Sequence, residues 1–277
     1  METQSAVTPV MAMILGAVQG LTEYLPVSSS GHLVIAQSLF GLTAPELLFD
    51  IILHLGTLTA VAWFYRKELY EIIAHSWHGA RRLAGGAAWG AVMAEYPGFR
   101  WAWLIIVGSV PTGIIGVLFE KKFEELFSAP GIVGAMLMVT ASFLYMTRWF
   151  NPTHRGIEGM RWWEAVLIGV AQGLAITPGI SRSGATICAA LLLGLERETA
   201  ARYSFLLSIP AVAGALVLGL RNGWHAPSMA AMGLGFTMSL AVGYASLALL
   251  VAMVKRGRLP WFSYYLFPVG ALAIFFL

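Results

Sequence analysis

Three ionisable side chains, those of Glu23, His32 and Arg182, stand in stretches of the sequence that are otherwise apolar. A charged group inside a membrane costs roughly 3 kcal/mol on insertion scales, so such residues are candidates for function. Gln19 and Glu23 are four positions apart, which puts both on one face of a helix. Ser29 and His32 are three positions apart, so a hydroxyl and an imidazole could pair as nucleophile and base within one helical turn.

Arg182 supplies the complementary chemistry, because the planar fork of a guanidinium suits the oxygens of a phosphate group. It lies in the segment 178–186, which reads PGISRSGAT. A helix that begins after a break also points free N–H groups and the positive end of its dipole at an anion. Phosphoryl transfer needs mainly positioning and charge stabilisation. These residue types therefore predict a site that binds a highly charged anion and transfers a phosphoryl group.

The segment around Glu23 and the segment around Arg182 belong to an internal duplication. A shift of 153 positions aligns them without a gap. The shared positions include Gly16 with Gly169, Gln19 with Gln172, Gly20 with Gly173, Ser28 with Ser181, Ser30 with Ser183 and Gly31 with Gly184. In this alignment Ser29 lies opposite Arg182, and Glu23 lies opposite Ile176. The first copy keeps the acid, base and nucleophile candidates, and the second keeps the guanidinium.

The composition is that of an integral membrane protein. Apolar residues make up 58% of the 277 positions and charged residues 11%, and the mean hydropathy is +0.75. About 20 apolar residues suffice to cross a hydrocarbon core of roughly 30 Å. The sequence predicts such spans at about 46–65, 101–119, 131–150, 203–220, 229–254 and 260–277.

Charge and cysteine content exclude several other classes of protein. The net charge is +3, but no basic face is interleaved with aromatic residues, so no nucleic-acid partner is expected. Basic loops beside an anionic membrane surface explain the charge better. Cys188 is the single cysteine, which excludes a disulfide framework and a metal cluster of thiolates.

Each copy of the duplication contains a break in an apolar run, at 26–31 and at 177–179. Irregular backbone at membrane depth is tolerated only where it is buried in protein or lines a cavity, so each break predicts a re-entrant helix–break–helix unit. Three predicted spans follow each unit. The fold class is therefore an all-α polytopic membrane protein with six spans and two re-entrant units. We expect a single membrane domain, 1–277, built from two inverted-topology repeats, about 1–150 and 151–277.

Loop charges predict the orientation of this arrangement. The loops 66–100, 148–162, 196–202 and 255–259 share one predicted side and carry most of the lysines and arginines. The other side has only Lys121, Lys122 and Arg221. Because cytoplasmic loops carry the excess of basic residues, the first side is predicted to be cytoplasmic. Tryptophans such as Trp63, Trp101 and Trp224 cluster at predicted span ends, as an aromatic belt does.

Alternative interpretations exist for several of these residues. The serines beside the breaks could only hydrogen-bond neighbouring helices, and Gln19 could be a packing amide. Arg182 and Glu23 could form a purely structural ion pair. Asp50 and His54 lie one turn apart in a predicted span, where a helix-end or packing role is favoured. As a whole, an inverted repeat with broken helices is also the design of transporters and lipid flippases.

At this point the sequence resembles a known family. QGLTEYLPVSSSGH at 19–32 resembles the first signature of undecaprenyl-diphosphate phosphatases of the bacitracin-resistance type, and PGISRSGAT resembles the second. The similarity extends over essentially the whole chain, including FDIILHLGTLTAV at 49–61. The resemblance implies a hydrolase of the bacterial cytoplasmic (inner) membrane. Such an enzyme converts undecaprenyl diphosphate to undecaprenyl phosphate and inorganic phosphate, which recycles the lipid carrier for cell-wall peptidoglycan synthesis.

The resemblance also implies roles for particular residues. Glu23 would be the essential carboxylate, Ser29 and His32 the hydroxyl and imidazole, and Arg182 the phosphate-binding arginine. The supporting substrate ligands would be Gln19, Ser28, Ser30, Ser181, Ser183 and Thr186. Attack by Ser29, by His32 or directly by water stays open.

Three further expectations follow from the resemblance. Dependence on Mg²⁺ or Ca²⁺ is expected of the family, with Glu23 as the best candidate ligand. Many members have Glu where this chain has Gln19, which weakens the case for a cation held by two carboxylates. The site is expected to open toward the periplasm. A homodimer is compatible with this interpretation.

Overall fold

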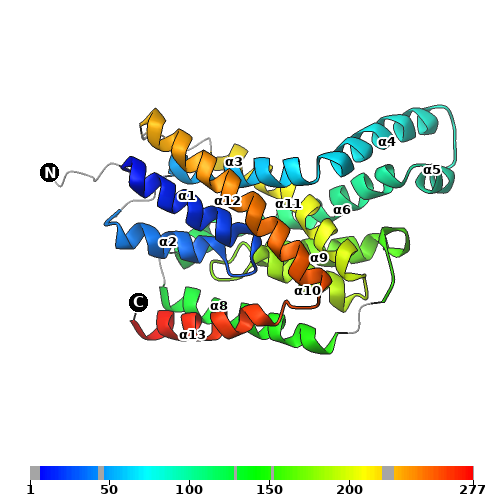
Figure 1. The fold of residues 1–277 in the computed structure, drawn as a ribbon. Helices are drawn as coiled ribbons and strands as arrows, with labels where there is room; N and C mark the ends of the chain where they lie inside the picture. The colour runs from blue at the N-terminus through cyan, green and yellow to red at the C-terminus, as the bar shows by residue number, and fades with distance from the viewer. Residues whose placement is uncertain (1–6, 43–46, 128–129, 151–152, 220–227, 277) are drawn as a thin grey trace.

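The computed structural model describes residues 7–42, 47–127, 130–150, 153–219 and 228–276, and in these residues the regular structure is helical apart from one isolated bridge between Arg155 and Leu195. In the first half the helices are α1 (Pro9–Tyr24), α2 (Ser29–Leu39), α3 (Leu47–Phe64), α4 (Arg66–Ala84), α5 (Trp89–Glu95), α6 (Pro97–Leu118), α7 (Glu120–Phe127) and α8 (Pro130–Met146). In the second half they are α9 (Trp162–Leu174), α10 (Arg182–Leu192), α11 (Arg197–Gly219), α12 (Met229–Lys255) and α13 (Trp261–Phe276) (Figure 1). Short 3₁₀ turns lie at Thr147–Trp149 and Ile157–Gly159.

Several helices are long and apolar enough to cross a membrane. The described residues contain four of them, at Pro97–Leu118, Gly131–Trp149, Arg197–Leu218 and Met229–Lys255. A fifth candidate is the pair of α3 and α4, which bends by 76° between Phe64 and Arg66. Every predicted span is a helix in the structure, although α13 is short for a span at 16 residues. The chain is therefore a multi-pass, all-helical membrane protein.

Both predicted breaks are confirmed. Helix α1 ends at Tyr24 and α2 begins at Ser29, and between them Ser28 adopts a left-handed backbone conformation with φ of 68°. In the second copy α9 ends at Leu174 and α10 begins at Arg182, with Gly179 at φ of 92°. Non-glycine residues rarely adopt positive φ, so the backbone at Ser28 is held in place by the surrounding structure.

The first helix of each unit packs against a long helix of the other half. Helix α1 lies along α12, and α9 lies along α6. A Cβ atom added at Gly16 would lie 2.5 Å from the carbonyl oxygen of Gly235, and one added at Gly169 would lie 1.9 Å from that of Gly108. Such distances leave room only for glycine. The glycines that the duplication repeats thus permit the same close helix approach in both halves.

The remaining long helices also pair across the halves. Helix α3 packs against α11 and α12, and α11 packs against α6. Helices α8 and α13 lie side by side along one edge of the bundle (Figure 1). These contacts between helices of different halves interlock the two halves.

The two helix–break–helix units return to opposite ends of the bundle. Phe40, after α2, belongs to one apolar cluster with Val7 and with Ala231 at the start of α12. At the other end, the backbone N–H of Glu196, after α10, donates to the carbonyl of Arg155, which precedes α9. Each unit therefore begins and finishes at the same end of the bundle.

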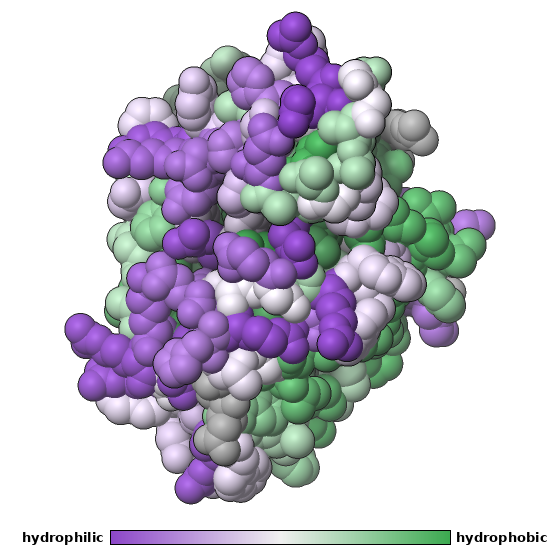
Figure 2. All heavy atoms as spheres, turned by 90° about the vertical axis from the view of Figure 1, so that its right-hand side faces the viewer, coloured by the Kyte–Doolittle hydropathy of each residue, from purple (hydrophilic) through white to green (hydrophobic). Residues whose placement is uncertain are grey.

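The basic loops gather at the end where α9 begins and α12 finishes. Lys255 pairs with Glu198 at 3.0 Å, and Arg100 donates to the backbone carbonyls of Ile157 and Met160. These contacts join the four loops in two pairs, and the hydrogen bond from Glu196 to Arg155 links the pairs. Figure 2 views this end directly and shows hydrophilic side chains over much of it. Arg221 and Trp224 lie outside the described residues.

Candidate active site

The carboxylate of Glu23 is the meeting point of side chains from three helices. Arg182, from α10, places Nη2 2.5 Å from Oε1 of Glu23. The Ser29 hydroxyl, from α2, donates to Oε2 at 2.7 Å, and Nε2 of Gln19 donates to the same oxygen at 2.9 Å. The side chain of Glu23 is only 6% exposed. The structure thus brings together Gln19, Glu23, Ser29 and Arg182, as the sequence predicts.

Two polar atoms of this cluster are buried without a hydrogen-bond partner among the described residues. They are Nη1 of Arg182 and Oε1 of Gln19. A buried donor without an acceptor costs about 1–3 kcal/mol, so such atoms in a native protein call for an explanation. An oxyanion beside Arg182 would accept from Nη1. The cluster therefore has unused capacity to bind an anion.

His32 does not pair with Ser29 in the structure. Its Nδ1 lies 2.9 Å from the carbonyl oxygen of Ser28, which can only accept, so Nδ1 carries the hydrogen. Its Nε2 lies 2.8 Å from the hydroxyl of Tyr265 on α13, which donates to it. Helical spacing places Ser29 and His32 on one face but does not fix the side-chain rotamers. The ring turns toward α13, and the hydroxyl turns toward Glu23.

His54 on α3 is the imidazole nearest to the cluster. Its Nε2 lies 3.8 Å from Oε2 of Glu23, and its side chain is 33% exposed. Its Nδ1 lies 2.8 Å from the carbonyl oxygen of Asp50. The sequence alone favours a packing or helix-end role for Asp50 and His54. An ionisable residue inside a predicted span was the available signal, but sequence gives no sign that α3 faces α1 at this level.

The four predicted serine ligands lie at the junctions between the breaks and the helices that follow them. Ser28 and Ser30 have their hydroxyls 3.4 Å apart, and the equivalent Ser181 and Ser183 have theirs 3.2 Å apart. Ser181 also caps α10, because its hydroxyl oxygen accepts from the backbone N–H of Gly184. These serines are therefore held by one another and by the start of the helix.

Two residues of the second copy face away from Glu23. The hydroxyl of Thr186 donates to the carbonyl of Arg182 at 2.8 Å and also contacts the hydroxyl of Ser204 on α11. Gln172 donates to Thr112 on α6 at 3.2 Å. Gln172 is thus a packing amide, whereas its counterpart in the first copy contacts the central carboxylate.

The side chains in this region do not form an all-protein site for a divalent cation. Among the described residues, no group of three His, Cys, Asp or Glu side chains converges. Both oxygens of Glu23 already accept hydrogen bonds, from Arg182 on one side and from Ser29 and Gln19 on the other. Calcium takes six to eight oxygen ligands and magnesium six, so Glu23 alone is insufficient.

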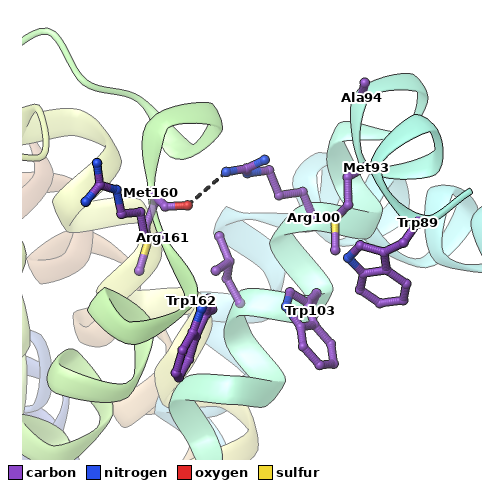
Figure 3. Close-up of a pocket in the computed structure, with 10 residues that line it drawn as sticks. Trp89, Met93, Ala94, Arg100, Trp103, Met160, Arg161 and Trp162 are labelled. Carbon is purple, nitrogen blue, oxygen red and sulfur yellow. Dashed lines mark hydrogen bonds between the residues drawn. The ribbon is translucent and has the colours of Figure 1, made fainter.

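A separate pocket of about 420 Å³ opens at the end of the bundle that carries the basic loops. Its walls are Trp89, Gly90, Met93, Ala94, Arg100, Trp103, Leu104, Met160, Arg161 and Trp162 (Figure 3). Arg100 already donates to backbone carbonyls, and Arg161 points away from the other labelled side chains. The pocket shares no residue with the Glu23 cluster and lacks converging polar groups, so it is not the candidate active site.

The fold and the cluster together define a multi-pass membrane protein in which Glu23, Ser29 and Arg182 meet between two helix breaks. Comparison with known proteins then gives the family. Residues 12–272 match the family model described as bacitracin resistance protein BacA. The chain belongs to this family.

Named relatives cover nearly the whole chain. The chain is 47% identical over 262 residues to the undecaprenyl-diphosphatase of Desulfatibacillum aliphaticivorans, which covers 94% of this chain and 95% of the relative. It is 43% identical over 265 residues to the undecaprenyl-diphosphatase of Methanosphaera stadtmanae, with coverages of 95% and 96%. The family resemblance of the two sequence motifs is therefore confirmed.

Proposed function

We propose that this protein hydrolyses undecaprenyl diphosphate to undecaprenyl phosphate and inorganic phosphate, and so recycles the lipid carrier for cell-wall synthesis. The names of its relatives support this activity. The observation that carries the proposal is the meeting of Ser29 and Arg182 on Glu23, with Nη1 of Arg182 buried and without a partner. A nucleophile, a base and an anion-binding donor thus occupy one site.

In the proposed mechanism the diphosphate lies between the first turns of α2 and α10, with its terminal phosphate against Arg182. The hydroxyl oxygen of Ser29 attacks the terminal phosphorus, and its proton passes to Oε2 of Glu23, 2.7 Å away. The bridging P–O bond breaks, and its electron pair leaves with undecaprenyl phosphate. The positive ends of the two helix dipoles and Arg182 stabilise the developing charge.

The second step returns the site to its starting state. Water adds to the phosphorus of the phosphoserine, and the bond to the Ser29 oxygen breaks. Glu23 gives its proton back to that oxygen, and the hydrogens of the water leave with inorganic phosphate. His32 stays a predicted catalytic residue, but the bonds to Ser28 and Tyr265 mean that its ring must turn before it can act on phosphorus.

The proposal includes the finer architecture of six spans in two inverted-topology repeats. Three features support it: the two breaks, the exchanged contacts of α1 with α12 and of α9 with α6, and the return of each unit to its own end. A two-fold axis in the membrane plane that relates the two halves would place both breaks near the midplane of the membrane.

We place the protein in the bacterial cytoplasmic membrane, with the basic end in the cytoplasm and the site opening toward the periplasm. The gathering of Arg100, Arg155, Arg202 and Lys255 at one end supports this orientation through the positive-inside rule. The α1–α2 unit, which carries Glu23 and Ser29, enters from the opposite end.

Dependence on Mg²⁺ or Ca²⁺ remains part of the proposal. Because the described side chains form no all-protein site, a cation would have to be held largely by the phosphate oxygens of the substrate, with Glu23 as the protein ligand nearest to them. Calorimetric titration of the purified protein with either cation, with and without substrate, tests this. Binding only in the presence of the diphosphate is expected.

Hydrolysis in detergent separates the proposed enzyme from a flippase, because no membrane remains to be crossed. Purified protein should convert undecaprenyl diphosphate to the monophosphate with stoichiometric release of phosphate, and Glu23→Gln should abolish the conversion. Well-folded protein that releases no phosphate with and without added Mg²⁺ or Ca²⁺, but moves the lipid across vesicle membranes, would overturn the proposal.

A further inference from the structure

The pocket at the basic end of the bundle has a volume of about 420 Å³ and takes no part in the mechanism above. One wall consists of Trp89 on α5 and Trp103 on α6, whose rings pack edge to face with centroids 5.2 Å apart. The other wall is Trp162, the first residue of α9. Figure 3 shows the indoles of Trp103 and Trp162 extending in the same direction from the two helices. Tryptophans from both halves of the chain thus line one pocket.

The interior of this pocket is apolar. Its most buried lining residues are Leu104 and Met160, which are 2% and 1% exposed, and Met93 lines it from α5. The three tryptophans, in contrast, are between 38% and 64% exposed. Tryptophans that stay exposed at the end of a membrane-spanning helix are typical of the level where acyl chains meet headgroups. The pocket therefore opens at a depth where lipid surrounds the protein.

Two cations lie at the edge of the apolar interior. Arg100 donates from Nε to the carbonyl of Ile157 at 3.0 Å and from Nη2 to that of Met160 at 2.8 Å. Both acceptors are neutral, and among the described residues Nη1 of Arg100 has no partner. Arg161 is exposed, and its side chain points away from the tryptophans (Figure 3). An apolar interior with cations at its edge matches a molecule that has an apolar chain and an anionic headgroup.

The acidic residues of the surrounding helices do not offset these two charges. The residues that line the pocket include no Asp or Glu. Helices α5, α6 and α9 carry only two acidic residues, and each pairs with another arginine, Glu95 with Arg82 at 3.2 Å and Glu164 with Arg155 at 2.6 Å. The edge of the pocket is therefore electropositive and complementary to an anionic headgroup.

We propose that this pocket binds one anionic phospholipid from the leaflet at the basic end, with part of an acyl chain between the tryptophans and the phosphate on Nη1 of Arg100 and on Arg161. Anionic phospholipids are the abundant lipids of this chemistry at membrane surfaces. The bound lipid bridges α5 and α6 of the first half to α9 of the second, beside the hydrogen bonds of Arg100 that already join them. The site shares no residue with the Glu23 cluster, and the inference does not rest on the proposed function.

Substitutions can separate the apolar contact from the charge. Trp162→Ala removes one wall, and Trp163→Ala is its control, because Trp163 is the next residue of α9, is also exposed and does not line the pocket. Arg161→Gln removes one cation, and Arg256→Gln, at an exposed arginine of the basic end outside the pocket, is its control. Gly90 lines the pocket and an added Cβ atom meets no atom within 4 Å, so Gly90→Leu is a second variant that fills open space there.

Native mass spectrometry of delipidated protein in detergent measures the affinity for phosphatidylglycerol, an anionic probe, and for zwitterionic phosphatidylcholine. We expect the wild type to retain one phosphatidylglycerol at least about fivefold more tightly than phosphatidylcholine. Arg161→Gln should weaken phosphatidylglycerol binding about fivefold and reduce this preference. Trp162→Ala and Gly90→Leu should weaken the binding of both lipids at least about tenfold. The two control variants should bind as the wild type does.

Thermal unfolding in detergent gives an independent measurement, because a ligand that binds only the folded protein raises the unfolding temperature. Phosphatidylglycerol should raise the unfolding temperature of the wild type and of both controls. It should raise that of Trp162→Ala and Gly90→Leu much less. Size-exclusion elution establishes that each variant is folded.

The inference is overturned if folded Trp162→Ala and Gly90→Leu bind phosphatidylglycerol as tightly as the wild type does; if one of them does not fold, the other decides. It is also overturned if the wild type binds phosphatidylcholine as tightly as phosphatidylglycerol, or if Arg161→Gln keeps the full preference. Undecaprenyl phosphate that displaces phosphatidylglycerol at equal concentration would overturn the choice of a phospholipid and make the pocket a site for the carrier lipid. None of these measurements depends on hydrolysis of a diphosphate, so a failure of the proposed function would be seen separately.

Discussion

Arg182 and Glu23 lie 159 positions apart in the chain and form an ion pair whose Nη2 and Oε1 atoms are 2.5 Å apart. The pair joins the break of the first half to the break of the second. Because Nη1 of Arg182 has no partner among the described residues, the pair ties the halves together and still leaves a donor for a ligand.

The guanidinium fork of Arg182 is expected to matter beyond its charge. Arg182→Lys keeps a cation that can pair with Glu23, but it loses the second N–H group that is free to hold a phosphate oxygen. We expect kcat/KM for undecaprenyl diphosphate to fall at least about 100-fold while thermal stability changes little. Arg82→Lys, at an exposed pair with Glu95, is the control. Near-normal turnover by Arg182→Lys would contradict the proposal that one N–H group of Arg182 pairs with Glu23 while another holds a phosphate oxygen.

Ser29 is expected to carry the phosphoryl group during turnover. Substrate labelled in its terminal phosphate should be mixed with the enzyme and quenched rapidly, in acid to preserve phosphoserine and in parallel in alkali to preserve phosphohistidine. The acid quench should trap a phosphoserine, and peptide mass spectrometry should locate it at position 29. Ser29→Ala should trap nothing, whereas Ser142→Ala should trap a normal amount, since the exposed Ser142 only donates to a carbonyl of its own helix. Label on His32 would make the imidazole the nucleophile. Label on neither residue would favour direct attack by water.

The contact between α9 and α6 is expected to tolerate no side chain at Gly169. A Cβ atom there would lie 1.9 Å from the carbonyl oxygen of Gly108. Overpacking of this kind typically costs about 1–3 kcal/mol, so Gly169→Ala should clearly lower the unfolding temperature in detergent. Gly113→Ala, in the same α6, meets no atom within 4 Å and should leave that temperature unchanged or raise it. Equal effects of the two substitutions would mean that α9 and α6 do not approach so closely.

The orientation can be tested with single cysteines, because the native Cys188 is buried and should react slowly. Arg82→Cys and Arg256→Cys lie at the exposed basic end, and Lys121→Cys lies on α7. A maleimide that cannot cross the cytoplasmic membrane should label positions 82 and 256 only in inside-out vesicles. It should label position 121 only in intact cells whose outer envelope has been made permeable. The reverse pattern would place the basic end outside the cytoplasm.

Much of the fold could be predicted from sequence, because the apolar core of a membrane requires apolar helices and tolerates irregular backbone only where protein buries it. The breaks at Ser28 and Gly179 were predictable since polar and helix-breaking residues interrupt apolar runs. The pairing of Gln19 with Glu23 followed from helical spacing, and the structure has that hydrogen bond. The repeated glycines marked the duplication, although only the structure shows which helices approach each other there.

The details of the site depend on rotamers and on contacts across the halves, which spacing does not specify. Ser29 and His32 share a helix face, yet one side chain turns to Glu23 and the other to Tyr265. Tyr265 lies 233 positions away from His32, and no local pattern connects the two. The sequence shows His54 as an ionisable residue in a predicted span, but its place beside Glu23 depends on how α3 packs against α1.

The central claim is that residues of both breaks form one phosphatase site, and phosphate release is its most direct test. Purified wild type should be compared with Ser29→Ala, Arg182→Ala and His32→Ala, using undecaprenyl diphosphate with and without a chelator of divalent cations. We predict that the wild type releases phosphate, that the Ser29 and Arg182 variants lose this activity while remaining folded, and that the His32 variant is also impaired. Wild-type rates in folded Ser29→Ala and Arg182→Ala proteins would contradict the account.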